Sequence, residues 1–213
     1  MRDLGAYLVA NTASCTPHST LEVIEAAVAG GIHWVQLRAK DESAREFFGL
    51  ALAAAKLTEG KAELLINDRI DVFLAARAAG AAVSGIHIGQ KDVPVRLARE
   101  LIGQGIIGLS ASTPEQIAQA NADAQFINYL GVGAVRATPT KKDHPTPLGL
   151  DGFAHRASLS DLPCVAIGAV TADDAAAIRT AGGAGLAVVR PVCQADDPRA
   201  ASALLVSAWE GAK

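Results

Sequence analysis

The residues with the clearest chemical meaning lie in a short basic segment, "QLRAK", at positions 36–40. In an extended chain successive side chains point to opposite faces, so Gln36, Arg38 and Lys40 share one face. Two cations and an amide on one face suit a polyanion, and burying them together without an anion would be costly. We interpret the segment as an anion site, and a solvated strand end is the plainer alternative.

Carboxylates follow two further apolar segments. Asn67 and Asp68 come directly after "LLI", and Asp92 ends the segment "HIGQKD". Mg²⁺ prefers hard oxygen ligands, takes few of them from the protein and completes its shell with water and phosphate. The pattern predicts that Asp68 and Asp92 bind Mg²⁺ beside a diphosphate. The alternative is that each carboxylate caps the helix that follows it.

The segment "GVGAVRATPTKKDHPTPLG", residues 131–149, fits neither a helix interior nor a central strand, because its prolines remove hydrogen-bond donors and fix φ. It is also long for a loop in a compact domain, and such loops are usually functional or disordered. His144, within it, is expected to be solvated.

Two residues near the ends of other apolar segments have more than one interpretation. Ser110 ends an apolar run just before a helical pattern, so a helix cap and a ligand contact are both open. His87 lies in the middle of an apolar run, on the face opposite Ile86 and Ile88. We expect it to be a packed, hydrogen-bonded core histidine and not a catalyst.

The elements that must position these residues alternate along the whole chain. Short β-branched runs are separated by longer amphipathic ones, several of which open on Ser or Thr and close on Gly. Eight such units, spaced about 25 residues apart with no composition break, predict a single (β/α)8 TIM barrel over residues 1–213. A doubly wound open sheet is the rival. The expected strands are residues 6–11, 33–38, 63–68, 85–89, 106–110, 126–131, 163–168 and 185–190.

The barrel interpretation agrees with where the polar residues fall. In this fold the active site lies at the carboxyl ends of the strands, and the strand ends here carry most of the polar side chains. The last two strand ends, "AIGAVTADD" and "VVRPVCQADDP", fit a phosphate site built from loop amides and a short helix N-terminus, with Gly168 allowing close approach. One barrel mouth is therefore expected to hold two anions.

The composition limits the partners and the compartment. Half of the chain is apolar but only 4% is aromatic, which suits buried parallel strands packed by small aliphatic residues. The net charge of −3 argues against nucleic acid as a partner. No apparent signal peptide, no run of about eighteen apolar residues and an odd number of cysteines predict a cytoplasmic protein without a membrane span. Nothing pairs Cys15 with Cys193, and Cys164 is expected in a buried strand.

Taken together, these motifs resemble the thiamine phosphate synthase family. The matching segments run in order over nearly the whole chain, and their joint order and spacing are more specific than any one of them. They are "VQLRAKD", "LLINDRIDVFLAARAAG", "GIHIGQKDVP", "IIGLSAS", "YLGVGAVRATPTKKDHPTPLGLDGF", "PCVAIGAV" and "GAGLAVVRPVCQADDP".

The resemblance implies a Mg²⁺-dependent transferase of thiamine biosynthesis. It would join an aminopyrimidine diphosphate to a thiazole phosphate, giving thiamine phosphate and diphosphate from small phosphorylated substrates, and it leaves open whether the chain forms a homo-oligomer. The residues implied to contact the pyrimidine diphosphate are Gln36, Arg38, Lys40, Asn67, Ser110 and Lys141, of which Arg38, Lys40, Ser110 and Lys141 are the catalytic candidates. Those implied to meet the thiazole phosphate are Thr138, Pro139, Thr140, Gly168, Val189 and Arg190. Asp68 and Asp92 would bind the metal.

Three departures from the family pattern cluster on the thiazole side. Ala134 and Arg136 stand where the family usually has a proline and an aromatic residue, Gly168-Ala169 replaces a Gly-Gly pair, and Arg190 replaces a small serine. The two arginines either supply charge-assisted contacts to the same phosphate or mark a changed acceptor. The alternative functions are a thiazole tautomerase-like isomerase, which would need neither "QLRAK" nor paired aspartates, and a non-catalytic barrel that binds a phosphorylated ligand.

Overall fold

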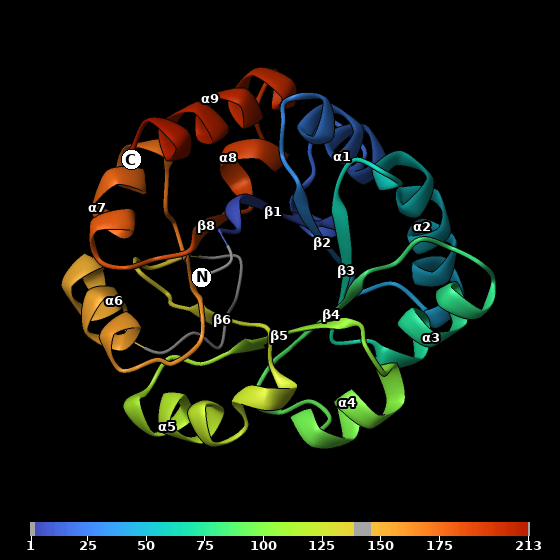
Figure 1. The fold of residues 1–213 in the computed structure, drawn as a ribbon. Helices are drawn as coiled ribbons and strands as arrows, with labels where there is room; N and C mark the ends of the chain where they lie inside the picture. Colours follow the sequence, from blue (N-terminus) through green and yellow to red (C-terminus); the bar gives the residue numbers. More distant parts are fainter. Residues whose placement is uncertain (1–2, 139–145, 213) are drawn as a thin grey trace.

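The structure, a computed structural model, describes residues 3–138 and 146–212. Eight parallel strands pair in chain order and β8 pairs back with β1, so the sheet closes into a barrel. Figure 1 looks along this barrel, with the helices in a ring around the strands. The predicted (β/α)8 fold is confirmed, and the open sheet is excluded. The strands are β1 Gly5–Asn11, β2 Trp34–Arg38, β3 Glu63–Asn67, β4 Gly85–Ile88, β5 Ile106–Ser110, β6 Tyr129–Val132, β7 Cys164–Ile167 and β8 Gly185–Val188.

Three of the helices that follow strands start with a capping box. Ser19, Ser43 and Thr113 each accept a hydrogen bond from the third residue of their helix, whose Glu or Gln side chain returns one. The helices are α1 Thr20–Ala29, α2 Ala44–Thr58, α3 Ile70–Ala78, α4 Val95–Ile102, α5 Pro114–Ala122, α6 Gly149–Ser158, α7 Ala175–Thr180, α8 Arg190–Cys193 and α9 Pro198–Gly211, with 3-10 turns η1 Thr12–Ser14, η2 Ala124–Phe126 and η3 Ala172–Asp174.

Alternation along each strand separates two layers of packing. In β2, Val35 and Leu37 join the large apolar cluster between the strands and the helices. Trp34 joins a second cluster inside the barrel, with Tyr7 and Tyr129 packed against it. The barrel interior is therefore filled by side chains, as the fold requires.

Two expected strand boundaries are wrong by more than one residue. The predicted strand 126–131 begins at Tyr129, because Phe126 closes a 3-10 turn by donating its amide to the Asp123 carbonyl at 2.9 Å. The predicted strand 185–190 ends at Val188, and Arg190 opens the short helix α8. Pro191 lies in the first turn of that helix, where its missing N–H costs nothing.

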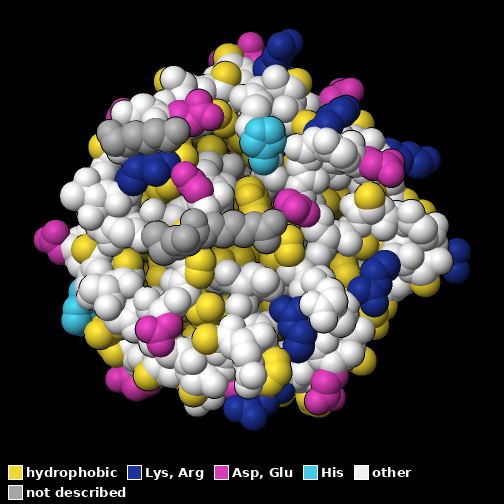
Figure 2. All heavy atoms as spheres, viewed as in Figure 1, with side chains coloured by type: hydrophobic (Ala, Val, Ile, Leu, Met, Phe, Trp, Pro, Cys, Tyr) yellow, Lys and Arg dark blue, Asp and Glu magenta, His cyan; other side chains and the backbone are white. Residues whose placement is uncertain are grey.

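The surface does not gather charge of one sign on the face drawn in Figure 2. Acidic and basic side chains are interspersed there, with apolar atoms between them, in keeping with the net charge of −3. Within residues 3–138 and 146–212, no helix combines the length and the apolarity needed to cross a membrane.

Cys15 and Cys193 are both free thiols, as expected, but they lie close enough to interact. A hydrogen bond between the thiols lowers the pKa of Cys15, and the same bond, with burial, raises the pKa of Cys193. The Thr16 amide also donates to the Cys193 carbonyl at 3.3 Å. The loop after β1 is thus held against α8. Cys164 is buried in β7, as expected.

Candidate active site

The closed barrel brings the predicted anion-binding residues to one end. Gln36 and Arg38 lie in the carboxyl half of β2, Asn67 ends β3 and Ser110 ends β5. Parallel register keeps these ends level, since Leu37 pairs with Ile66 and Asn67 pairs with His87. Lys40, Asp68 and Asp92 occupy the loops that leave the same strand ends. Residues from four parts of the sequence therefore share the mouth of the barrel.

The charged groups of this mouth interact directly. The Lys40 ammonium forms an ion pair with Asp68 Oδ2. Burial raises the pKa of Asp92 above its usual range, the Gly89 amide opposes that rise, and the nearby charge of Asp68 adds to it. Two nearby carboxylates form a local concentration of negative charge, which the ion pair of Lys40 with Asp68 offsets in part.

Neither aspartate caps a helix, so the capping alternative is wrong. The N-cap residue of α3 is Arg69 and that of α4 is Pro94, and neither helix start has a side-chain capping bond. Asp92 instead accepts the Gly89 amide at 2.7 Å, within its own loop. Asp68 has a φ of 59°, a left-handed conformation that is costly for a residue other than glycine. Such strain clusters at functional sites, where the surrounding structure holds it in place.

The paired carboxylates fit Mg²⁺ by the chemistry of their donors. Asp68 and Asp92 supply hard anionic oxygens on adjacent loops, and the charge of Asp68 disfavours ionisation of Asp92, an effect that a cation between them would offset. In the part of the chain that the structure describes, no group of three or more His, Cys, Asp and Glu side chains could hold a metal. Mg²⁺ often takes only one or two protein carboxylates and completes its shell with water and phosphate, so two suffice here.

Arg38 is positioned by residues that the sequence interpretation did not include. Its Nη1 donates to Asn11 Oδ1 at 2.6 Å, and Asn11 Nδ2 donates to Ser14 Oγ at 2.6 Å. Burial lowers the pKa of Arg38, while the charge of Asp68 counteracts that effect. The signal for Asn11 was present, because an asparagine that ends a barrel strand lies at the catalytic face.

A chain of buried hydrogen bonds runs beneath the mouth. Gln36 Nε2 donates to Tyr7 Oη at 3.0 Å, and the hydroxyls of Tyr7 and Tyr129 are 2.8 Å apart. His87 Nδ1 lies 2.8 Å from Tyr129 Oη, and its Nε2 lies 3.0 Å from Ser110 Oγ. His87 is buried and hydrogen-bonded, as predicted. Ser110 is not a cap, because the N-cap of α5 is Thr113.

The loop after β6 is laid along the end of β7. Val135 and Arg136 donate their amides to the carbonyls of Ile167 and Gly168, at 2.9 and 3.0 Å. A Cβ on Gly168 would lie 2.6 Å from Ala134 Cα, so only glycine permits this approach. Ala169, where the family pattern has glycine, keeps the left-handed conformation with a φ of 50°.

Arg136, one of the residues that depart from the family pattern, forms an ion pair with Asp174. Its two terminal nitrogens donate to the two oxygens of Asp174, at 2.7 and 2.6 Å, and Nη1 also reaches the Ala169 carbonyl at 3.2 Å. Asp174 further accepts the Thr171 amide at 2.9 Å. Arg136 therefore ties the loop after β6 to the loop after β7, and this guanidinium is not presented to a phosphate.

Arg190, unlike Arg136, has no carboxylate partner among the described residues. It lies half-buried at the start of α8, next to Val189, and the structure gives its side chain no hydrogen bond or ion pair with any described residue. Thr138 is half-buried at the edge of the described segment, and Pro139, Thr140, Lys141 and His144 lie outside the described residues.

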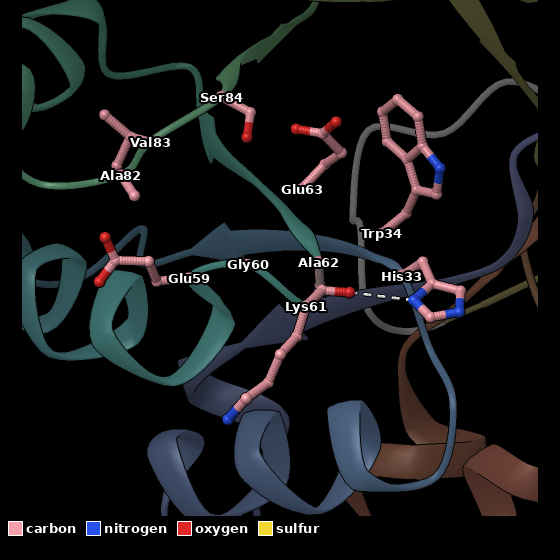
Figure 3. Close-up of a pocket in the computed structure, with 10 residues that line it drawn as sticks. All are labelled: His33, Trp34, Glu59, Gly60, Lys61, Ala62, Glu63, Ala82, Val83 and Ser84. Atoms are coloured by element: carbon pink, nitrogen blue, oxygen red, sulfur yellow. Dashed lines mark hydrogen bonds between the residues drawn. The ribbon is translucent and has the colours of Figure 1, made fainter.

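A separate cavity of about 560 Å³ lies at the other end of the barrel. Figure 3 shows its walls, which come from the starts of β2 and β3 and from the loops before β3 and β4. His33 Nδ1 hydrogen-bonds the Lys61 carbonyl there at 3.0 Å. Because barrel enzymes act at the carboxyl ends of the strands, we place the active site at the opposite mouth, despite this cavity.

Cations, amides and paired carboxylates at the carboxyl ends of a closed parallel barrel define an enzyme of the (β/α)8 class, with a mouth suited to an anionic ligand. The family model described as thiamine monophosphate synthase matches residues 6–192. The chain belongs to this family, and it is a transferase of thiamine biosynthesis.

Individual relatives agree with this assignment. The thiamine-phosphate synthase of Corynebacterium efficiens is 42% identical over 208 residues, which cover 97% of this chain and 95% of the relative. That of Natronomonas pharaonis is 39% identical, over 99% and 97% of the two chains. The solved thiamine phosphate pyrophosphorylase of Pyrococcus furiosus is 28% identical with a TM-score of 0.86, over 99% of this chain and 98% of that one.

The Arg136–Asp174 pair leads to a stability prediction. Asp174 has a side chain only 8% exposed, so replacing Arg136 with Met leaves a buried carboxylate with fewer partners. We expect Arg136→Met to lower the free energy of unfolding by about 1–3 kcal/mol at neutral pH, measured by urea denaturation. The matched control is Arg69→Met, because Arg69 also makes a two-pronged pair, but with Asp71, whose side chain is 60% exposed. That change should cost less than about 1 kcal/mol.

The same pair fixes the sign of a pH effect. The hydrogen bonds from Arg136 lower the pKa of Asp174, so this stabilisation is fully present above the unfolded-state pKa of about 3.9. It is lost as the pH falls through the lower folded-state value. The stability gap between wild type and Arg136→Met should therefore close in acid, and a gap that stays constant down to low pH would contradict the assignment.

Proposed function

We propose that this barrel transfers a pyrimidinylmethyl group from an aminopyrimidine diphosphate to the ring nitrogen of a thiazole phosphate, forming thiamine phosphate and diphosphate with Mg²⁺. The observation that carries the proposal is the combination of Arg38 and Lys40 with the carboxylate pair Asp68 and Asp92 at adjacent strand ends. An isomerase of the thiazole phosphate would need neither half of that combination.

The reaction breaks the bond between the pyrimidine methylene carbon and the diphosphate oxygen. The electron pair leaves with the diphosphate, and the benzylic-type cation is captured by the thiazole nitrogen. Because charge accumulates on the leaving diphosphate, Arg38 and Lys40 stabilise the transition state more than the bound substrate. One unit-charge pair about 4 Å apart contributes roughly 4 kcal/mol at an effective dielectric near 20, against a typical enzymatic barrier reduction of about 8–23 kcal/mol.

Lys40 has a specific part in this step. In the structure its ammonium pairs with Asp68, and the lysine side chain is 49% exposed, so it is free to turn toward a ligand. We infer that the ammonium exchanges Asp68 for a diphosphate oxygen when the substrate enters, which leaves Asp68 for the metal. When bound, Mg²⁺ neutralises charge on the leaving diphosphate as a Lewis acid. Asn67 and Ser110 contact the same substrate, and Lys141 is assigned to it by family resemblance.

The acceptor half occupies the ends of β6, β7 and β8. Gly168 and Val189 border this part of the mouth, and Arg190, whose guanidinium pairs with no described residue, offers it to the acceptor's phosphate. Thr138 belongs to the same side, with Pro139 and Thr140 assigned to it by family resemblance. Arg136 acts on this half indirectly, because its pair with Asp174 holds the two bordering loops together.

The direct test supplies both substrates with Mg²⁺ and quantifies thiamine phosphate and diphosphate. We expect the two products in equal amounts, and loss of turnover when a chelator removes the metal. Folded protein that makes neither product would exclude the transfer reaction. Turnover that persists in excess chelator would exclude Asp68 and Asp92 as ligands of an essential Mg²⁺.

Arg190→Ser tests the acceptor site. If the Arg190 guanidinium binds the thiazole phosphate, its loss should raise the KM of that substrate at least about tenfold, the value of one charge-assisted hydrogen bond. The KM of the pyrimidine diphosphate should stay within about twofold, because its site lies at the ends of β2 to β5 and is unchanged. Steady-state kinetics with each substrate varied in turn measure both values. An unchanged KM for the thiazole phosphate would show that Arg190 does not bind it.

A further inference from the structure

The buried hydrogen bonds beneath the mouth join two residues, Gln36 and Ser110, that the family resemblance assigns to the pyrimidine diphosphate. The chain starts at Gln36, passes through Tyr7, Tyr129 and His87, and ends at Ser110. Its two tyrosines are each 1% exposed and His87 is 8% exposed. Polar groups buried this deeply need their hydrogen bonds, because an unsatisfied one is costly.

Each hydroxyl in this chain has one hydrogen to donate, and a buried hydrogen needs an acceptor. With every hydrogen given an acceptor within the chain, the fixed donor at Gln36 determines the direction of every bond. Gln36 Nε2 can only donate, so Tyr7 Oη accepts there and passes its own hydrogen to Tyr129. The Tyr129 hydrogen then goes to His87 Nδ1, which must accept. His87 is therefore a neutral imidazole with its hydrogen on Nε2, and it donates that hydrogen to Ser110 Oγ.

The tyrosines remain protonated, as this order requires. Burial raises the pKa of Tyr7 to about 12, and burial raises that of Tyr129 as well. With both hydroxyls protonated at neutral pH, every hydrogen bond of the buried chain has a fixed direction, and the chain has no net charge.

Glycines in the neighbouring strands reserve the space for this chain. A Cβ on Gly108 would lie 2.3 Å from Tyr129 Oη and 2.5 Å from His87 Nδ1, inside any permitted contact. A Cβ on Gly131 would lie 3.1 Å from His87 Cε1. The barrel therefore leaves room for His87 and Tyr129 by having glycine, which lacks a side chain, at positions 108 and 131.

We propose that the buried chain sets the polarity of the pyrimidine site, holding Ser110 as a hydrogen-bond donor and Gln36 as an acceptor. Ser110 Oγ accepts from His87, so its own hydrogen points to the ligand. The Gln36 amide donates one of its two hydrogens to Tyr7, which fixes the orientation of the amide, and no described residue donates to its oxygen. His87 is a positioning residue, because it acts on the ligand through Ser110.

This polarity selects a ligand. It requires a ring with an acceptor atom beside Ser110 and a donor group beside Gln36, which an aminopyrimidine supplies through a ring nitrogen and its amino group. The opposite polarity would favour a ring with a carbonyl in place of the amino group. The inference about the ligand rests on the proposed function, whereas the hydrogen-bond directions rest on the protein alone.

The first experiment measures those directions without substrate. Protein labelled with ¹⁵N in histidine is examined by two-bond ¹H–¹⁵N NMR, and the His87 signals are identified by their absence from His87→Gln. We expect a neutral ring protonated on Nε2, and in Tyr129→Phe a shift of that signal toward the other tautomer. A His87 protonated on Nδ1 in the wild type would overturn the proposal, whether or not the protein is a transferase.

The second experiment measures the effect on the substrate. Tyr129→Phe should raise the KM of the pyrimidine diphosphate about tenfold and leave that of the thiazole phosphate unchanged. His87→Leu should do the same, while His87→Gln, whose amide can both accept and donate, should stay within about threefold of the wild type. The control is Thr58→Val, which removes another fully buried hydroxyl, one that bonds within α2 far from the mouth.

The outcomes test separately the hydrogen-bond directions within the protein and the effect of those directions on the substrate. Equal effects on both substrates, or equal KM values for His87→Leu and His87→Gln, would reduce His87 to a structural role. Absence of any transfer activity, combined with the Nε2–H form of His87, would overturn the proposed function and leave the hydrogen-bond directions standing. If Tyr129→Phe fails to fold, the two His87 variants and the wild-type spectrum still decide the question.

Discussion

Parallel pairing of β8 with β1, in a register that runs from Gly5 opposite Gly185 to Leu8 opposite Val188, closes the sheet on itself. Closure brings the carboxyl ends of all eight strands around one mouth. Side chains that are far apart in the sequence are then forced into contact, and Lys40 meets Asp68 although they follow different strands. The anion site, the carboxylate pair and the buried chain beneath them all depend on this constraint.

The fold and much of the mouth could be predicted because they follow from local rules. Strand runs and capping residues are encoded within a few positions, and the barrel places strand ends together once the strands are known. Gln36, Arg38 and Lys40 needed only the alternation of an extended chain. The structure adds that Asp68 and Asp92 are not caps, which removes the alternative that the same local rules had left open.

The remaining features depend on contacts that no local pattern encodes. Tyr7 and Tyr129 hydrogen-bond across 122 positions of sequence, and Arg136 meets Asp174 across 38. Arg136 looked like a phosphate ligand because its charge was visible in the sequence and its partner was not. The proximity of the free thiols Cys15 and Cys193 was not foreseen for the same reason, since closure of the barrel brings the loop after β1 to α8.

The central claim is that one mouth holds two anions in separate places, and a crystal structure with Mg²⁺, thiamine phosphate and diphosphate tests it most directly. The account predicts diphosphate beside Arg38 and Lys40, with the metal between it and the carboxylates of Asp68 and Asp92. It also predicts the phosphate of thiamine phosphate at the ends of β7 and β8, within reach of Arg190. Diphosphate bound at the ends of β7 and β8, or a metal that contacts neither aspartate, would contradict the account.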